Sequence, residues 1–241
     1  MSKPRVAVFR PDDGRLGDAV ELLTDLGVDP EADPMLAVDP TGDHPRKDAD
    51  YVVFTSKTGA ELAADADWHP EGAFVCAIGE STADALEAEG YTVDIVPDEF
   101  SSVGLVATLA GRVDGERVEV ARSDHGSDVL LDGLNDEGAF VHETVLYRLV
   151  RPEGTGSSAV LAADGELNAA LFTSSLTVEH FLDAAETEGV REAAIEGLNR
   201  AVVGTIGEPT RETAEAHGIA VDVVPEEADF ETLARTVVEK L

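Results

Sequence analysis

An internal repeat limits the folds that this chain can adopt. The segment AIGESTADALEAEGYTVDIVP (77–97) returns as TIGEPTRETAEAHGIAVDVVP (205–225), at a constant step of 128 residues. A shorter pair accompanies it, FTSKTGAEL from Phe54 and FTSSLTVEH from Phe172. Both copies predict one strand–turn–helix–strand unit. Two similar lobes leave a cleft between them, and a cleft is where ligands bind.

Short strands rich in β-branched residues alternate with amphipathic helical stretches along the chain. We expect strands at 5–9, 35–38, 51–56, 74–79, 92–97, 117–122, 140–152, 169–174, 201–207 and 221–225. We expect helices between them, including 14–27, 58–65, 127–137, 175–188, 190–197 and 229–240. Alternation of this kind predicts an α/β fold with parallel sheets and right-handed crossovers.

The repeat also predicts two sheets, and therefore two lobes. The first copy starts too late to include residues 1–36, and the second copy would otherwise lack a strand and a helix. We therefore expect an inserted α/β lobe at 37–150 and a discontinuous α/β lobe that combines 1–36 with 151–241. The extended segments 35–38 and 145–151 are then expected to be the two crossings between the lobes.

The chain is strongly acidic. Asp and Glu total 50 against 17 Lys and Arg, so the formal net charge is −33. The acidic residues are spread along the chain, which is typical of proteins that stay solvated at high salt. We interpret the charge as adaptation of a halophilic protein to a salt-rich cytoplasm. The alternative is an acidic surface for a basic partner. Nucleic acid is disfavoured as a partner, because phosphate binding requires clustered cations.

Several other chemistries find no support in the sequence. Neither GxGxxG after a strand nor GxxxxGK[ST] occurs, which disfavours nucleotide binding through those loops. The six histidines have no ligand-like spacing with Cys76, the single cysteine, so we expect no metal site. The N-terminus lacks a signal-peptide pattern, and no apolar run reaches the length of a membrane span. We therefore expect a cytoplasmic protein without membrane attachment, and a monomer is the default expectation for its oligomeric state.

Hydroxyl residues or glycine stand where five expected strands end and helices begin. These turns are Thr55-Ser56, Gly79-Glu80-Ser81-Thr82, Arg122-Ser123, Thr173-Ser174-Ser175 and Gly207-Glu208-Pro209-Thr210. Ligands of open parallel sheets bind at the carboxyl ends of the strands. Helix N-termini at that edge offer free N–H groups, which suit carboxylates or phosphates. The alternative for each Ser or Thr is a helix N-cap with no further role.

Three more residues are candidates for the predicted cleft. Tyr147, in TVLYRLV, lies on an expected crossing, so its hydroxyl can face the cleft. The alternative is a packed hinge tyrosine. Arg10 and Arg122 are among the few cations, and each follows or ends an expected strand. The alternative for both arginines is a surface salt bridge in an acidic protein.

Six segments occur in a characteristic order and spacing. They are VFRP, VVFTSKTGAELA, AIGESTADALEAEGYTVDIVP with FSSVGLVATL, RVEVARSDHGSDVLLDGLNDEGAFVHETVLYR, LFTSSLTVEHFL and VVGTIGEPTRETAEAHGIAVDVVP. With these segments the chain resembles the uroporphyrinogen-III synthase family along its whole length. The resemblance implies two flavodoxin-like lobes joined by a two-strand connector. One departure is that the family often has Arg-Gly where this chain has Arg122-Ser123-Asp124.

The resemblance also implies an activity in tetrapyrrole biosynthesis. Family members convert hydroxymethylbilane into uroporphyrinogen III with inversion of ring D, and they use no metal or organic cofactor. By position, substrate contacts are implied for Thr55, Ser56, Lys57, Ser81, Thr82, Ser174, Ser175 and Thr210. Tyr147 falls where the family places a tyrosine that assists loss of the substrate hydroxyl. The alternative function is a two-lobe anion-binding or regulatory protein without catalysis.

Overall fold

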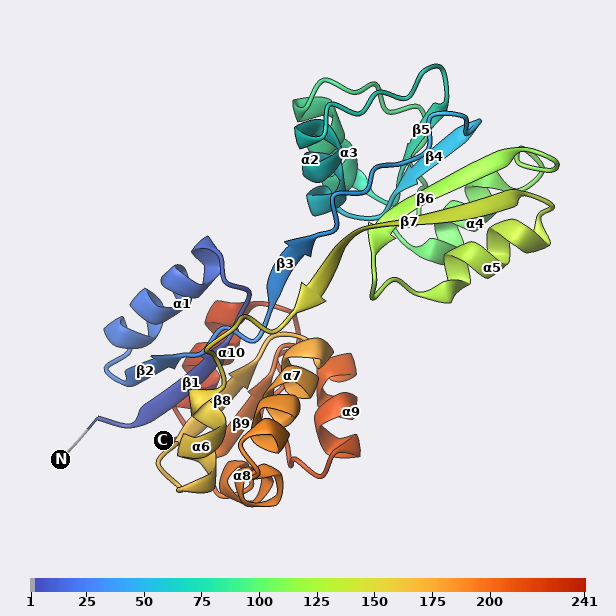
Figure 1. Cartoon of the computed structure of the whole chain (residues 1–241). Coiled ribbons are helices and arrows are strands. Elements are labelled where there is room, and N and C mark those ends of the chain that lie inside the picture. Colours follow the sequence, from blue (N-terminus) through green and yellow to red (C-terminus); the bar gives the residue numbers. More distant parts are fainter. Residues whose placement is uncertain (1–2) are drawn as a thin grey trace. The chain divides into compact units, whose positions relative to one another are not determined.

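Within residues 3–241, which the computed structural model describes, the strands form two separate sheets (Figure 1). One compact unit combines the described residues up to Ala37 with Val150–Leu241, and the other consists of Val38–Leu149. Strand and helix alternate in both units, and the predicted α/β class is confirmed.

The first unit contains a four-stranded sheet in the order β2-β1-β8-β9. Its three ladders are parallel. The strands are β1 (Arg5–Phe9), β2 (Asp29–Ala32), β8 (Ala169–Phe172) and β9 (Val202–Thr205). The helices are α1 (Gly14–Asp25), α6 (Ser157–Ala163), α7 (Ser175–Thr187), α8 (Arg191–Leu198), α9 (Glu208–Ala216) and α10 (Phe230–Val238).

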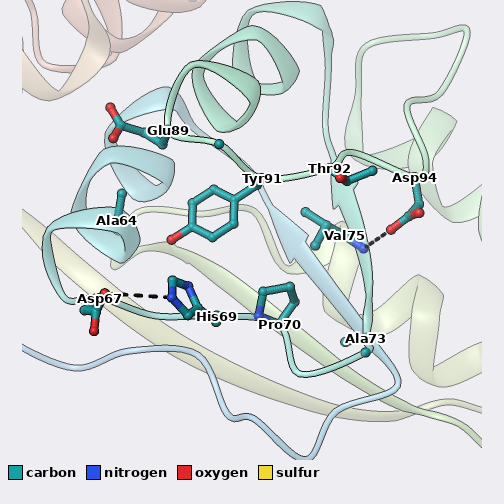
Figure 2. Close-up of a pocket in the computed structure, with 12 residues that line it drawn as sticks. Ala64, Asp67, His69, Pro70, Ala73, Val75, Glu89, Tyr91, Thr92 and Asp94 are labelled. Atoms are coloured by element: carbon teal, nitrogen blue, oxygen red, sulfur yellow. Dashed lines mark hydrogen bonds and ion pairs between the residues drawn. The ribbon is translucent and has the colours of Figure 1, made fainter.

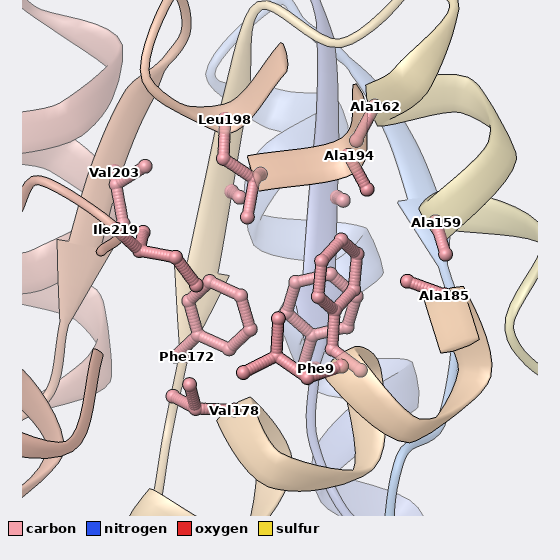
Figure 3. Close-up of a cluster of buried hydrophobic side chains, with 14 of the residues drawn as sticks. Phe9, Ala159, Ala162, Phe172, Val178, Ala185, Ala194, Leu198, Val203 and Ile219 are labelled. Atoms are coloured by element: carbon pink, nitrogen blue, oxygen red, sulfur yellow. The ribbon is translucent and has the colours of Figure 1, made fainter. Parts of the chain in front are cut away.

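Successive side chains of β1 point to opposite faces of this sheet. Val6 and Val8 pack with α1 and α10, whereas Ala7 and Phe9 pack with α6, α7, α8 and α9. On the second face Phe9 stacks on Phe172 with ring centroids 4.5 Å apart, among small and branched side chains (Figure 3). The sheet of the first unit is therefore buried on both faces, as expected for a parallel sheet.

A buried carboxylate fastens the end of β2 to the start of α6. Asp33 is 2% exposed, and its carboxylate accepts the N–H groups of Gly156 and Ser158 at 2.8 and 2.9 Å. The Ser158 hydroxyl donates to the same carboxylate. Asp33 precedes strand β3 (Ala37–Pro40), and Gly156 follows strand β7 (Phe140–Val150). The cluster therefore anchors the two segments through which the chain leaves the first unit and returns to it.

We expect Asp33→Ala to lower the free energy of unfolding by about 3 kcal/mol, because it leaves several buried donors without an acceptor. Urea denaturation of the full chain measures the loss. Asp29→Ala is the control, since that carboxylate is exposed and lies 4.0 Å from Arg5 Nε. It should cost no more than about 0.5 kcal/mol. Equal losses in the two variants would contradict this interpretation.

The second unit contains a five-stranded sheet in the order β3-β7-β6-β4-β5. The strands are β3 (Ala37–Pro40), β4 (Tyr51–Phe54), β5 (Phe74–Ala77), β6 (Arg117–Ser123) and β7 (Phe140–Val150). The helices are α2 (Lys57–Asp65), α3 (Glu80–Ala88), α4 (Ser102–Leu109) and α5 (Asp128–Asp136). The first two helices share a buried cluster on one face of the sheet, and the last two share a cluster on the other.

Two predicted strands are wrong in the same way. Residues 92–97 and 221–225 form only single bridges, between Cys76 and Ile95 and between Gly204 and Val223. Asp94 accepts the Val75 N–H at 2.8 Å through its side chain, and Asp222 does the same for Val203 at 2.9 Å. In both places a side-chain carboxylate accepts the strand N–H that a backbone carbonyl would accept if the second strand were longer. Pro97 and Pro225 follow and limit further pairing.

Two elements were not predicted from the sequence. The strand β2 has the sequence DPEA, which is polar and contains a proline, and it lies at the edge of its sheet. An edge strand tolerates both features because one side of it needs no partner. Helix α6 is only seven residues long and follows a Gly-rich loop. Helix α6 packs closely against α8, which favours small residues such as alanine. The sequence therefore lacks the periodic large apolar residues by which a helix is recognised.

Candidate functional site

The structure joins two predicted residues in the second unit. Tyr147 lies on β7 and packs in the apolar cluster beneath α2 and α3, with only 6% of its surface exposed. Its hydroxyl donates to Ser56 Oγ at 2.9 Å. Ser56 is the N-cap of α2, and the same oxygen accepts the Gly59 N–H at 3.0 Å. Tyr147 and Ser56 therefore form one hydrogen-bonded pair at the carboxyl edge of the sheet.

The turn after β6 holds the backbone that follows the Tyr147 side chain. The Asp124 N–H donates to the Tyr147 carbonyl at 3.2 Å, and the Asp124 carboxylate accepts the Leu149 N–H at 3.0 Å. His125 Nδ1 lies 2.8 Å from the same carboxylate. Burial raises the pKa of Asp124, but hydrogen bonds from His125 and Leu149 outweigh it and bring the pKa below its ordinary value. Asp124 was not among the predicted residues.

Arg122 is engaged within the second unit. Its side chain is buried, Nε donates to Glu143 Oε1 at 2.5 Å, and Nη1 donates to the Ser127 carbonyl at 2.6 Å. The turn closes over the arginine so tightly that a Cβ on Gly126 would lie 2.5 Å from Arg122 Cδ. Ser123 ends β6 at the register shift beside it. Arg122 is thus a buried ion-pair residue that shapes the turn, and not the surface salt bridge offered as the alternative.

A pocket of about 390 Å³ runs along α2 and α3, and Lys57 and Ser81 line it together with the carboxylates of Glu61, Asp84 and Glu89. Gly79, the N-cap of α3, supplies no side-chain cap, and its carbonyl accepts the N–H groups of Thr82 and Ala83. The N–H groups before Thr82 are therefore available to a ligand. Thr82 itself is 3% exposed. Thr55 follows β4, and its N–H donates to the Ala121 carbonyl at 3.3 Å.

The first unit has one capped and one uncapped helix at the corresponding edge. Ser174 caps α7 in a reciprocal pair with Thr177, and the Ser175 hydroxyl donates to the Pro209 carbonyl at 3.1 Å. Gly207 precedes α9 and supplies no side-chain cap, as Gly79 does for α3. Thr210, at the third position of α9, is 4% exposed. The hydroxyls of Ser174 and Ser175 thus have partners in the unit, whereas the start of α9 is open to an anion.

Two buried polar atoms at this edge have no hydrogen-bond partner among residues 3–241, namely Arg10 Nε and Thr205 Oγ1. Arg10 follows β1, and its guanidinium carbon lies 4.4 Å from the ring centroid of Phe230. Burial and the neighbouring Arg15 lower the pKa of Arg10, although arginine keeps its charge. Thr205 ends β9 and was not predicted. Its place at a strand end, two residues before Gly207, is the signal that sequence reasoning passed over.

A well-formed pocket of about 460 Å³ lies at the opposite edge of the second sheet (Figure 2). Its lining includes Ala73, which directly precedes β5, and Tyr91, which follows α3. It includes none of the predicted residues. Asp67, Glu89 and Asp94 also line it, and their charges disfavour a carboxylate or phosphate ligand. The pocket also lies away from the strand ends and helix starts that carry the predicted residues, and for that reason it is not the candidate site.

No group of three or more His, Cys, Asp or Glu side chains in the described part of the chain is arranged to hold a metal ion. No helix within residues 3–241 is long and apolar enough to cross a membrane. In each unit, the candidate site consists of strand ends and helix starts. Hydroxyls, backbone N–H groups and a few cations are its chemical groups, and these suit an anionic ligand.

Comparison with known proteins assigns the family. The model of the family described as uroporphyrinogen-III synthase HemD matches residues 17–235. A putative uroporphyrinogen-III synthase of Methanothermobacter thermautotrophicus is 33% identical over 237 residues, which cover 92% of each chain. Another, from Archaeoglobus fulgidus, is 26% identical over 229 residues, covering 94% of this chain and 95% of the relative.

A solved structure supports the fold independently. A crystal structure of uroporphyrinogen III synthase from Thermus thermophilus matches with a TM-score of 0.68 at 20% identity, over 99% of this chain and 100% of that one. A likeness at this identity establishes the architecture, and the sequence matches supply the relationship. The chain belongs to the uroporphyrinogen-III synthase family.

Proposed function

We propose that this protein is a uroporphyrinogen-III synthase, which converts hydroxymethylbilane into uroporphyrinogen III and water. The observation that carries this proposal is the family match across residues 17–235, which spans most of both units. The substrate is a linear tetrapyrrole with carboxylate side chains. Groups that bind carboxylates occur at the strand ends of each unit, which agrees with such a substrate.

Tyr147 is the proposed proton donor. Its O–H proton passes to the departing hydroxyl of the substrate, which leaves as water and creates an azafulvenium cation. Ring D then attacks through its substituted carbon, and the spiro intermediate fragments and closes again in the inverted orientation. Loss of a proton from the final pyrrole returns one proton to the enzyme. Ser56 holds the Tyr147 hydroxyl at 2.9 Å and thereby orients it.

The remaining candidates are proposed to bind the carboxylates. In the second unit these are Thr55, Lys57, Gly79, Ser81, Thr82, Arg122 and Ser123, and in the first they are Arg10, Ser174, Ser175, Gly207 and Thr210. The strongest structural support is for the helix starts after Gly79 and Gly207, which carry no side-chain cap. Arg10 adds a cation whose Nε has no partner among the described residues. Holding a flexible substrate in one geometry is the main catalytic requirement, because unguided closure gives a different isomer.

We further propose that the protein acts as a cytoplasmic monomer, without a cofactor, in a salt-rich cell. The net charge of −33 opposes a polyanionic substrate at long range. At about 1 M salt the Debye length is about 3 Å, so this repulsion is screened while hydrogen bonds at contact remain.

A coupled assay tests the proposed function. Hydroxymethylbilane is supplied to the purified full chain, the products are oxidised, and isomers I and III are separated by chromatography. We expect isomer III to predominate with enzyme and isomer I to predominate without it. Isomer I alone in both reactions, from a protein that is folded by circular dichroism, would contradict the proposal.

A further inference from the structure

An exposed aromatic ring stands beside the uncapped start of α3. Phe100 is 60% exposed, although it is a large apolar side chain. The turn that carries it is held firmly, because the Ser101 N–H donates to the Glu99 carbonyl at 2.8 Å and Ser101 Oγ donates to the Glu99 carboxylate at 2.8 Å. Ser101 also caps α4. The position of the Phe100 backbone is therefore fixed although its ring faces solvent.

The close approach of Phe100 explains the glycine at position 79. Gly79 has a φ of −173°, an extended conformation that any residue adopts. A Cβ at this position, however, would lie 3.1 Å from Phe100 Cβ and 3.2 Å from its Cγ. A side chain at position 79 would therefore press against the Phe100 ring and make it shift, whereas the backbone conformation itself would allow one. The glycine allows the ring to lie directly against the turn from which α3 starts.

The start of α3 offers polar groups next to this ring. The N–H groups of Glu80 and Ser81 have no partner among the backbone hydrogen bonds of the described chain. Thr82 is 3% exposed, and none of the hydrogen bonds found within residues 3–241 uses its hydroxyl. A side chain at this third helical position points back toward the helix start. By contrast, Thr177 at the same position of α7 is hydrogen-bonded to Ser174.

We propose that Phe100 is a positioning residue, which packs against the face of one pyrrole ring of the substrate while α3 binds a carboxylate of that ring. The inference rests on the proposed function. A pyrrole with acetate and propionate side chains combines a flat apolar face with anionic groups a few bonds away. An aromatic wall beside free N–H groups and the Thr82 hydroxyl matches that combination.

The second copy of the repeat lacks this arrangement. The residue 128 positions after Phe100 is Ala228. A Cβ placed on Gly207 would have only one neighbouring atom in contact, Pro209 Cδ at 3.9 Å. The nearby aromatic residue of that unit, Phe230, is covered by the Arg10 guanidinium. The second unit can thus hold a ring together with its carboxylate, whereas α9 offers only the carboxylate site.

The test compares Phe100→Ala with Phe140→Ala in the isomer III assay. Phe140 is 68% exposed and begins β7, at the opposite edge of the same sheet, so it is a matched control. An aromatic contact of this kind changes a binding constant about fivefold. We expect Phe100→Ala to raise KM about fivefold with little change in kcat, Phe100→Tyr to restore KM, and Phe140→Ala to leave both unchanged.

A second measurement uses the contact with Gly79. Gly79→Ala should raise KM in the wild-type background, because the new Cβ displaces the ring. In a Phe100→Gly background, which removes both the Cβ and the ring, the same change should add little. If wild-type protein makes isomer III and Phe100→Ala has the KM of Phe140→Ala, the inference is overturned while the proposed function stands. If wild-type protein makes no isomer III, the proposed function fails, and the inference fails with it.

Discussion

Tyr147→Phe is expected to lower kcat by a factor of about 100 or more, because a positioned proton donor contributes at least that much to a rate. The change removes one oxygen atom and leaves the packed ring in place. Ser56 Oγ still accepts the Gly59 N–H, so the cap of α2 survives. Isomer III formation under single-turnover conditions measures the effect, and thermal unfolding checks the fold.

Tyr91→Phe is the matched control for this experiment. The Tyr91 hydroxyl donates to the Trp68 carbonyl at 2.8 Å, in the pocket at the opposite edge of the same sheet. Its loss should affect stability slightly and kcat not at all. If Tyr147→Phe kept more than half of the wild-type kcat, Tyr147 would not be the proton donor. The pair with Ser56 would then have only a structural role.

Lowering the salt concentration is expected to raise KM for hydroxymethylbilane more than tenfold between about 2 M and 0.1 M KCl. The Debye length grows from about 3 Å at 1 M to about 10 Å at 0.1 M. Repulsion between a protein of net charge −33 and a polycarboxylate then acts over a longer range. Once the substrate is bound, the chemical step no longer depends on long-range repulsion between substrate and protein. The value of kcat should therefore change far less than KM.

The salt experiment must separate substrate repulsion from unfolding. Self-repulsion within an acidic protein also destabilises its compact state. Circular dichroism at each salt concentration identifies the range in which the fold persists, and KM is compared only within that range. An unchanged KM in folded protein would contradict the electrostatic account and remove the main support for salt adaptation. A KM that falls at low salt would contradict it more strongly.

The sequence predicted the secondary structure well where local patterns agree with packing. Strands such as β4 and β8 are continuous apolar runs because both faces of their sheets are buried, and such runs are readable without tertiary information. The two segments that end in Pro97 and Pro225 have the same local pattern. They were mispredicted as strands, because a side-chain carboxylate satisfies the neighbouring strand instead. Each of these side-chain hydrogen bonds joins residues about 19 positions apart in the chain, so the local pattern does not reveal it.

The candidate site was predictable as a set of positions but not as a set of contacts. Strand ends and helix starts follow from the pattern, and Ser56 and Tyr147 were both candidates on separate grounds. Their hydrogen bond spans 91 residues of sequence and could not be read from either segment. Arg122 is a further example, because its place at a strand end indicated a candidate ligand contact but not that Glu143 and the Ser127 carbonyl would also bind its guanidinium.

The sequence by itself determined the repeated strand–helix architecture, since hydrophobic periodicity and glycine placement are local properties that survive duplication. It also supplied the order of motifs that relates the chain to its family. Only the tertiary structure decided which polar groups are satisfied inside each unit and which remain free. Ser175 and Arg122 have partners, whereas Arg10 Nε and Thr205 Oγ1 have none among residues 3–241. A hydrogen bond forms between groups that lie close together in space, and folding brings together groups that are far apart in the sequence.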